Sequence, residues 1–129
     1  MDIRATNFGN VRKMRFEETV GLWKARIDVR GNTFSSRIPY LFWTGRLVFY
    51  VERDFDEWYS ELLREGVNCI FIKEDLSDLL EKVQWAFDPN NAKEVEKIRK
   101  GGMEFARKYF TQEFAVEYWA RSIMKALQT

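Results

Sequence analysis

The chain has 129 residues, the length of one ordinary domain with a core large enough to fold alone. Hydrophobic residues make up 46% and charged residues 32%, a balance typical of globular proteins and unlike that of disordered chains. The 21 Lys and Arg against 20 Asp and Glu leave a net charge of +1. No general electrostatic attraction to nucleic acid or to an anionic membrane surface is therefore expected.

Single residue counts exclude further classes of protein. The sequence has no histidine, which excludes Ser-His-Asp and Cys-His catalysis and His-ligated metals. The lone Cys69 excludes an internal disulfide and a Cys-based zinc site, and its apolar surroundings predict an inert buried thiol. The longest apolar runs, Ile38–Trp43 and Leu47–Val51, fall far below the ~18 residues of a membrane span. No apolar signal region opens the sequence, so nothing in it marks this chain for secretion, and the sequence does not indicate a localisation.

Short apolar runs alternate with helix-like stretches over the first two thirds of the chain. In chain order we predict strand Asp2–Thr6, helix Phe16–Ala25, strand Arg26–Arg30, turn Gly31–Phe34, helix Ser36–Thr44, strand Leu47–Val51, helix Phe55–Arg64, strand Val67–Ile72 and helix Leu76–Phe87. Gly45 follows the predicted helix Ser36–Thr44 at the position where a left-handed residue commonly ends a helix. Gly66 follows the predicted helix Phe55–Arg64. Asp75 is the expected N-cap of the helix Leu76–Phe87, with Asp78 as its capping-box partner.

After Asp88-Pro89-Asn90-Asn91 the pattern changes to two amphipathic helices, Ala92–Tyr109 and Thr111–Leu127, with Thr111 as the N-cap. Strands that alternate with helices indicate an α/β fold, a Rossmann-like parallel sheet flanked by helices. We therefore expect one domain over residues 1–129, with sheet units in 1–88 and two helices in 89–129 that pack back on them.

One strand-to-helix crossing has the composition of a phosphate site. Gly31 follows the strand RIDVR, Ser35 and Ser36 offer hydroxyls and amides, and Arg37 lies in the first turn of the next helix. Ligands of open α/β sheets bind at the carboxyl ends of strands, where helix N-termini and a guanidinium fork suit phosphate oxygens. The same residues are also common as an N-cap, a turn glycine and a surface arginine. The segment is neither a Walker loop nor GxGxxG, so spacing alone leaves both interpretations open.

Two longer segments favour the interpretation as a phosphate site. The runs KARIDVRGNTFSSRIPYLFWTGRLVFYV and EWYSELLREGVNCIFIKEDLSDL resemble the C-terminal half of the capsule-associated and Rumi-type protein O-glucosyltransferases. Members show a D/N-x-x-G turn leading to S-x-R-x-x-x-L, a hydrophobic strand, an acidic-aromatic helix and KxDLSDL. Almost the whole chain can be laid on this pattern, Asp2–Asn10 included. The resemblance implies the donor-binding C-terminal lobe of a GT-B enzyme that transfers glucose, xylose or a similar sugar from a nucleotide sugar, usually a UDP-sugar, to a hydroxyl.

The resemblance also implies residue roles. Arg37 falls on the arginine that binds the donor diphosphate, with Ser35 and Ser36 in the adjacent phosphate-contacting turn. The donor-binding turn itself is Gly31, Asn32, Thr33 and Phe34, with Phe34 bordering the nucleoside. Glu57, in the acidic-aromatic element, and Asp75, in KEDLSDL, are possible donor-side residues. Arginine and helix amides can stabilise a leaving diphosphate without a metal, so no cofactor beyond the donor is expected.

Two departures from the family pattern bear on activity. The family often has His-Tyr-x-Pro in the strand where this chain reads Asn68-Cys69-Ile70-Phe71. The chain also starts where the family's second lobe starts, so no residue here matches the acceptor base. We expect an acceptor-binding lobe or a second chain as partner, and no catalytic residue in this one. The alternative, from another class, is a non-catalytic interaction or homodimerisation module that kept the fold, with its aromatic residues at an interface.

Overall fold

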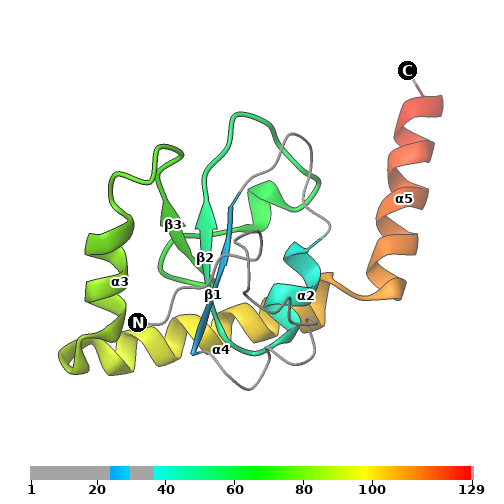
Figure 1. Ribbon diagram of the computed structural model, residues 1–129. Coiled ribbons are helices and arrows are strands. Elements are labelled where there is room, and N and C mark those ends of the chain that lie inside the picture. Colours follow the sequence, from blue (N-terminus) through cyan, green and yellow to red (C-terminus); the bar gives the residue numbers. More distant parts are fainter. Residues whose placement is uncertain (1–23, 30–36, 129) are drawn as a thin grey trace, which may run out of the picture.

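The computed structural model describes residues 24–29 and 37–128, so the predicted strand Asp2–Thr6 and turn Gly31–Phe34 lie outside the described residues, as does most of the predicted helix Phe16–Ala25. The described residues contain a three-stranded parallel sheet in the order β1-β2-β3 (Figure 1). β1 is Ala25–Asp28, β2 is Leu47–Val51 and β3 is Ile70–Ile72. Ile27 pairs with Phe49, which pairs in turn with Ile70, so β2 forms the centre of the sheet.

Helices cover both faces of this sheet, which confirms the predicted parallel α/β class. The helices are α2 (Ile38–Trp43), α3 (Leu79–Phe87), α4 (Ala92–Tyr109) and α5 (Gln112–Leu127), with short 3-10 turns η1 (Ser60–Leu62) and η2 (Pro89–Asn91). In Figure 1, α3 and α2 lie on opposite sides of the strands and α4 runs below them.

The central strand feeds two hydrophobic clusters. Val48 and Tyr50 point to the α2 side and pack with Phe42 and Phe105. The alternate residues Leu47, Phe49 and Val51 pack on the α3 side. All five residues of β2 are buried, as expected for a strand covered on both faces. α4 contributes to both clusters, through Phe105 to the first and Ile98 to the second.

Several predicted boundaries are confirmed. α4 has the predicted bounds, and Gly45 has a φ of 72° at the turn after α2. The Thr111 hydroxyl oxygen accepts a 3.1 Å hydrogen bond from the Phe114 amide, which is the N-cap contact expected at the start of α5. Cys69 is completely buried, as its sequence surroundings indicated.

The predicted helix Phe55–Arg64 is wrong, because only η1 forms there. Side chains take the backbone groups that a helix would need: the Ser60 hydroxyl accepts from the Glu57 amide at 2.7 Å, and the Asn68 carboxamide oxygen accepts from the Arg64 amide at 2.9 Å. Asn68 lies in a turn, so the next strand begins at Ile70 and not at the predicted Val67.

The predicted start of the helix at Leu76 is also wrong, since α3 begins at Leu79. Leu76 has a φ of 63°, outside the helical region. The Asp75 carboxylate accepts from the Ser77 amide at 2.9 Å, and the Asp78 carboxylate accepts from the Lys73 amide at 2.9 Å. Both aspartates therefore build the turn after β3 instead of a capping box.

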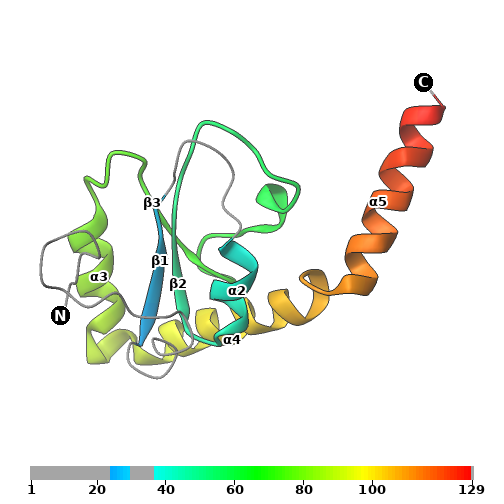
Figure 2. The ribbon, with the colours of Figure 1, turned by 45° about the vertical axis from the view of Figure 1, so that its right-hand side comes forward.

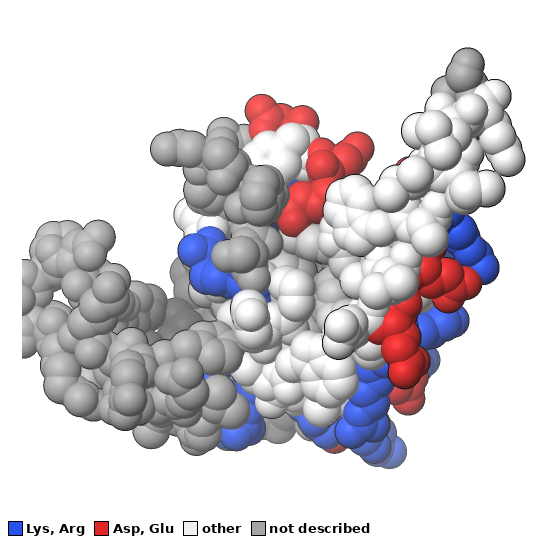
Figure 3. Space-filling model, turned by 90° about the vertical axis from the view of Figure 1, so that its right-hand side faces the viewer, with Lys and Arg blue, Asp and Glu red and all other residues white. Residues whose placement is uncertain are grey.

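α5 differs from the expectation that both C-terminal helices lie over the sheet. It leaves the end of α4 and projects away from the body (Figures 1 and 2), and none of its residues is buried. Its first turns are held by aromatic contacts of Phe114 and Tyr118 with Trp58. Figure 3 shows the largely uncharged surface of its outer part. Five large apolar side chains on this helix are exposed: Val116, Trp119, Ile123, Met124 and Leu127. Among the described helices, none has both the length and the apolar character required to cross a membrane.

Candidate functional site

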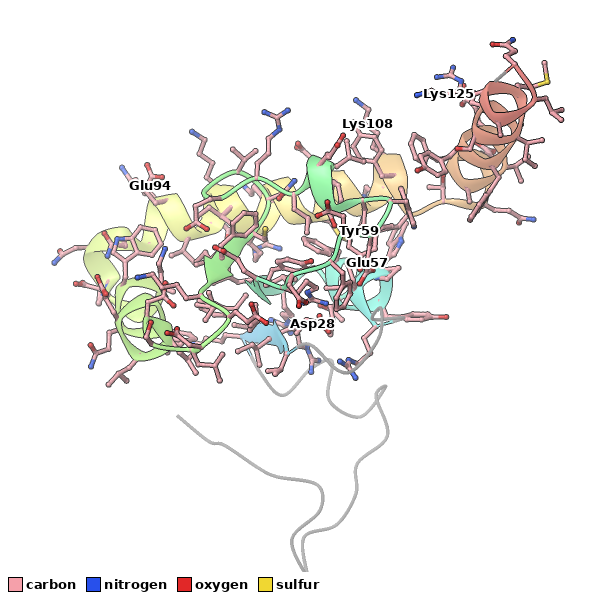
Figure 4. The ribbon with its side chains drawn as sticks, turned by 90° about the horizontal axis from the view of Figure 1, so that it is seen from above. Asp28, Glu57, Tyr59, Glu94, Lys108 and Lys125 are labelled. Atoms are coloured by element: carbon pink, nitrogen blue, oxygen red, sulfur yellow. The ribbon has the colours of Figure 1, made fainter. Side chains whose placement is uncertain are left out.

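Charged side chains meet at the carboxyl ends of β1 and β2. Asp28 is the last residue of β1, and Arg53 follows β2 by two residues. Because parallel neighbours end at the same edge of a sheet, these two residues lie together, and that edge is where α/β proteins bind ligands. Figure 4 looks onto this edge from above and shows Asp28, Glu57 and Tyr59 gathered over it.

Asp28 is the centre of this group. Its side chain has no exposed surface, and each carboxylate oxygen contacts an arginine. Arg53 Nη2 donates to Oδ2 at 2.7 Å, and Arg37 Nε donates to Oδ1 at 3.3 Å. An isolated carboxylate would be costly to bury, so the two guanidinium groups are what make this position possible.

Arg53 is buried as deeply as Asp28, with 1% of its side chain exposed. Its Nε and Nη2 donate to the Val51 carbonyl at 3.2 and 3.0 Å, and its guanidinium lies 4.2 Å from the centre of the Tyr50 ring. Within the described part of the chain, Nη1 has no hydrogen-bond acceptor and lies 3.7 Å from a Glu57 carboxylate oxygen. This arginine thus lies between the end of β2 and two acidic side chains, Asp28 and Glu57.

Glu57 and Tyr59 complete the group on the loop after β2. The Glu57 side chain is 7% exposed and accepts a short hydrogen bond from the Tyr59 hydroxyl. Burial, together with this bond, raises the pKa of Tyr59 far above its ordinary value. Burial likewise raises the pKa of Tyr50. The predicted donor-side residue Glu57 is therefore directed at Arg53 and Tyr59. We refer to Asp28, Arg53, Glu57 and Tyr59 together as the buried anchor.

Arg37 is the member of the site that reaches solvent. Its side chain is 60% exposed, although Nε is held by Asp28 and Nη2 donates to the Val29 carbonyl at 3.1 Å. Both contacts use the same side of the guanidinium, so its plane is fixed at the edge of the sheet. An exposed, oriented guanidinium at this edge suits an anionic ligand with several oxygen atoms.

The other predicted site residues are placed differently. Ser35, Ser36 and the turn Gly31, Asn32, Thr33 and Phe34 lie outside the described residues. Asp75 lies in the turn after β3, where hydrogen bonds from Ser77 lower its pKa. Among the contacts of the described residues, no hydrogen bond joins Asp75 to Asp28 or Arg53.

Sequence analysis missed Asp28, Arg53 and Tyr59 as members of the site. One signal was available, because Asp28 is a single acidic residue inside the short strand RIDVR, directly before a turn. Arg53 likewise comes directly after the apolar run of β2. Within residues 24–29 and 37–128, no three Cys, Asp or Glu side chains are arranged to hold a metal ion.

A family model matches nearly the full length of this chain, and known proteins match between about half and four fifths of it. The model of glycosyl transferase family 90 matches residues 2–126. Protein O-glucosyltransferase 2 of Danio rerio is 34% identical over 103 residues, which cover 80% of this chain and 20% of the relative. Human protein O-glucosyltransferase 1 is 31% identical over 97 residues, which cover 75% and 24%. Uncharacterized protein 179R of Invertebrate iridescent virus 6 is 32% identical over 68 residues, which cover 53% and 6%.

The chain thus spans about a fifth of the length of the first of these relatives. The matched residues 2–126 include the whole described sheet and the edge that carries Arg37 and its buried anchor. A family model that covers this much of the chain decides its membership: the chain belongs to glycosyl transferase family 90.

Proposed function

We propose that this chain forms the nucleotide-sugar-binding lobe of a glycosyltransferase and that Arg37 holds the diphosphate of the donor, a UDP-sugar. The observation that carries the proposal is the exposed side chain of Arg37, whose guanidinium contacts the buried Asp28 at the carboxyl edge of a parallel sheet. Membership in glycosyl transferase family 90 supports the class of reaction. Relatives named protein O-glucosyltransferase support glucose, or a similar sugar such as xylose, as the transferred group.

The fold is compatible with this role. A parallel sheet with helices on both faces is the layout of the donor-binding lobe in a two-lobed GT-B enzyme, and such lobes bind nucleotides beyond the carboxyl ends of their strands. Among the described residues, Arg53 and Glu57 of the loop after β2 lie at that edge beside Asp28. A second lobe, or another chain, would supply the acceptor side of the cleft.

The chemistry assigned to Arg37 is stabilisation of the leaving group. In the transfer, an acceptor hydroxyl oxygen bonds to the anomeric carbon while the bond from that carbon to the β-phosphate oxygen breaks. The electron pair of the broken bond stays on the departing diphosphate, whose growing negative charge faces the guanidinium. The hydroxyl proton passes to a base on the acceptor side, which we expect outside this chain.

We also assign roles to the two acidic residues. Since the Glu57 carboxylate is directed at Arg53 and Tyr59, we assign it to the support of the site and not to contact with the sugar. Asp75 is assigned to the turn after β3, because its carboxylate accepts from the Ser77 amide. Arg37 is then the described residue that we expect to touch the donor.

Calorimetric titration of UDP and of uridine tests this proposal. Arg37→Ala should weaken UDP binding by about 2 kcal/mol, or roughly 30-fold, as expected for loss of a charge-assisted contact. Uridine, which has no phosphate, should bind wild type and variant equally. Arg121→Ala is the matched control, since it removes another exposed arginine, on α5 and away from the sheet edge. Equal UDP affinity of wild type and Arg37→Ala, or no binding at millimolar UDP, would contradict the proposal.

A further inference from the structure

We propose that Asp28 and Arg53 are positioning residues that hold the Arg37 guanidinium in the orientation in which it receives the donor diphosphate. This inference rests on the proposed function and concerns two side chains that a bound donor need not touch. Their side chains are 0% and 1% exposed, whereas the Arg37 side chain is 60% exposed. The gradient from a buried pair to an exposed arginine is the arrangement expected of a supporting layer beneath a binding group.

Arg53 fixes the orientation of the Asp28 carboxylate. Arg53 is held by the Val51 carbonyl through two nitrogen atoms and by the Tyr50 ring beneath it, so its guanidinium has one available orientation. Its Nη2 then takes Oδ2 of Asp28 at 2.7 Å, a short charge-assisted bond. The second oxygen, Oδ1, is thereby directed toward Arg37, at the start of α2.

Asp28 in turn fixes the orientation of the Arg37 guanidinium. A long, exposed arginine normally samples many rotamers and must lose this freedom when it binds an anion. Here Nε contacts Asp28 and Nη2 contacts the Val29 carbonyl, which removes that freedom before a ligand arrives. The Arg37 side chain therefore loses its conformational entropy when the chain folds, so this loss does not weaken ligand binding.

A purely electrostatic role would have the opposite sign. Asp28 is a negative charge beside the site proposed for a diphosphate, so its neutralisation should strengthen UDP binding if orientation were irrelevant. Positioning predicts the reverse, because Asp28→Asn keeps the size but has only one oxygen acceptor. The buried Arg53 would take that oxygen, and the carboxamide nitrogen would then face the Nε donor of Arg37. The direction of the change thus separates the two explanations.

The experiment is a double-mutant cycle on UDP affinity, measured by calorimetry on the whole chain. Asp28→Asn should weaken UDP binding about tenfold in the wild-type background and less than about twofold in the Arg37→Ala background. Arg53→Lys keeps the buried charge but not the two-nitrogen grip on Val51, and it should also weaken binding. Should Asp28→Asn not fold by circular dichroism, Arg53→Lys carries the same cycle.

A second readout needs no nucleotide. The Nε–Hε group of Arg37, followed by nitrogen-15 relaxation, should be restrained in the wild type and mobile in Asp28→Asn, whereas that of Arg121 should not change. Stronger UDP binding in Asp28→Asn, equal weakening in both backgrounds, or a restrained Arg37 in the variant would overturn the inference. If Arg37→Ala weakens UDP binding and Asp28→Asn does not, only the positioning role fails. If Arg37→Ala leaves UDP affinity unchanged, the proposed function fails and takes the positioning role with it.

Discussion

Gly101 lies where α4 crosses the turn between η1 and β3, and its replacement by alanine tests this packing. A Cβ at Gly101 would approach the Val67 carbonyl oxygen to well under 3.0 Å, a separation that real Cβ atoms essentially never show. The neighbour is backbone and cannot rotate away. Gly101→Ala therefore requires α4 to move away from this turn by about an ångström.

The expected magnitude is the balance of two opposing effects. Alanine is favoured over glycine inside a helix by about 1 kcal/mol. Displacement of α4 disturbs Ile98 and Phe105, which it contributes to the two clusters, and overpacking of this kind costs about 3 kcal/mol. We expect a net loss of about 2 kcal/mol in the free energy of unfolding, or a fall of about 8 °C in Tm for a domain of this size.

Urea unfolding followed by circular dichroism measures this loss. Lys100→Ala is the control, because it changes an exposed neighbour on the same helix and should leave stability within about 0.5 kcal/mol. Gly102→Ala should lower the free energy of unfolding less than Gly101→Ala does. A Cβ at Gly102 would lie 2.8 Å from the Asn68 carbonyl oxygen, a less severe overlap than that of a Cβ at Gly101 with the Val67 carbonyl oxygen. A Gly101→Ala protein as stable as the wild type would refute the packing of α4 against this turn.

Three further predictions concern other side chains. Burial raises the pKa of Tyr59 above its ordinary 10.0, so the folded chain keeps a proton there that the unfolded chain releases. Above about pH 10 this group alone should lower the free energy of unfolding by up to about 1.4 kcal/mol per pH unit, a contribution that Tyr59→Phe removes and Tyr40→Phe leaves, as measured by urea unfolding at several pH values. Cys69 is fully buried and burial raises the pKa of its thiol, so Ellman's reagent should label it only in urea, and rapid labelling of the native chain would contradict its place in the core. Trp58→Ala removes the ring that holds α5 and should cost about 3 kcal/mol in unfolding free energy, whereas Trp119→Ser, at a side chain 61% exposed, should cost under about 0.5; equal losses would contradict the described aromatic contacts.

The parts of the fold that sequence predicted well are those decided by apolar pattern. The continuous apolar run Leu47–Val51 predicted a strand buried on both faces, and the 3.6-residue repeat of Ala92–Tyr109 predicted a helix with the observed bounds. Local chemistry was also sufficient at Thr111, whose hydroxyl caps α5 whatever the helix packs against.

The loop after β2 shows why other parts were missed. Its residues 55–64 have a helical pattern, but tertiary contacts outweigh that local preference. Glu57 is drawn toward Arg53, and Ser60 takes the amide of Glu57. Neither contact is visible in a local sequence window.

The buried anchor escaped sequence analysis for a topological reason. Asp28 and Arg53 are 25 residues apart and meet only because β1 and β2 are neighbours that end at the same edge. The order of strands in a sheet cannot be predicted from one sequence alone. The segment RIDVR could therefore suggest a buried Asp, but it could not identify Arg53 as the partner of that Asp. Arg37 was found because a guanidinium at the start of a helix is a local pattern, supported by the family resemblance.

A crystal structure of the chain with UDP would show directly whether Arg37 binds the donor diphosphate. We expect diphosphate oxygens within about 3.2 Å of the Arg37 guanidinium, at the carboxyl ends of β1 and β2, with the contact between Arg37 and Asp28 preserved. UDP bound at any other part of the molecule, or at this edge with its phosphates turned away from Arg37, would contradict it.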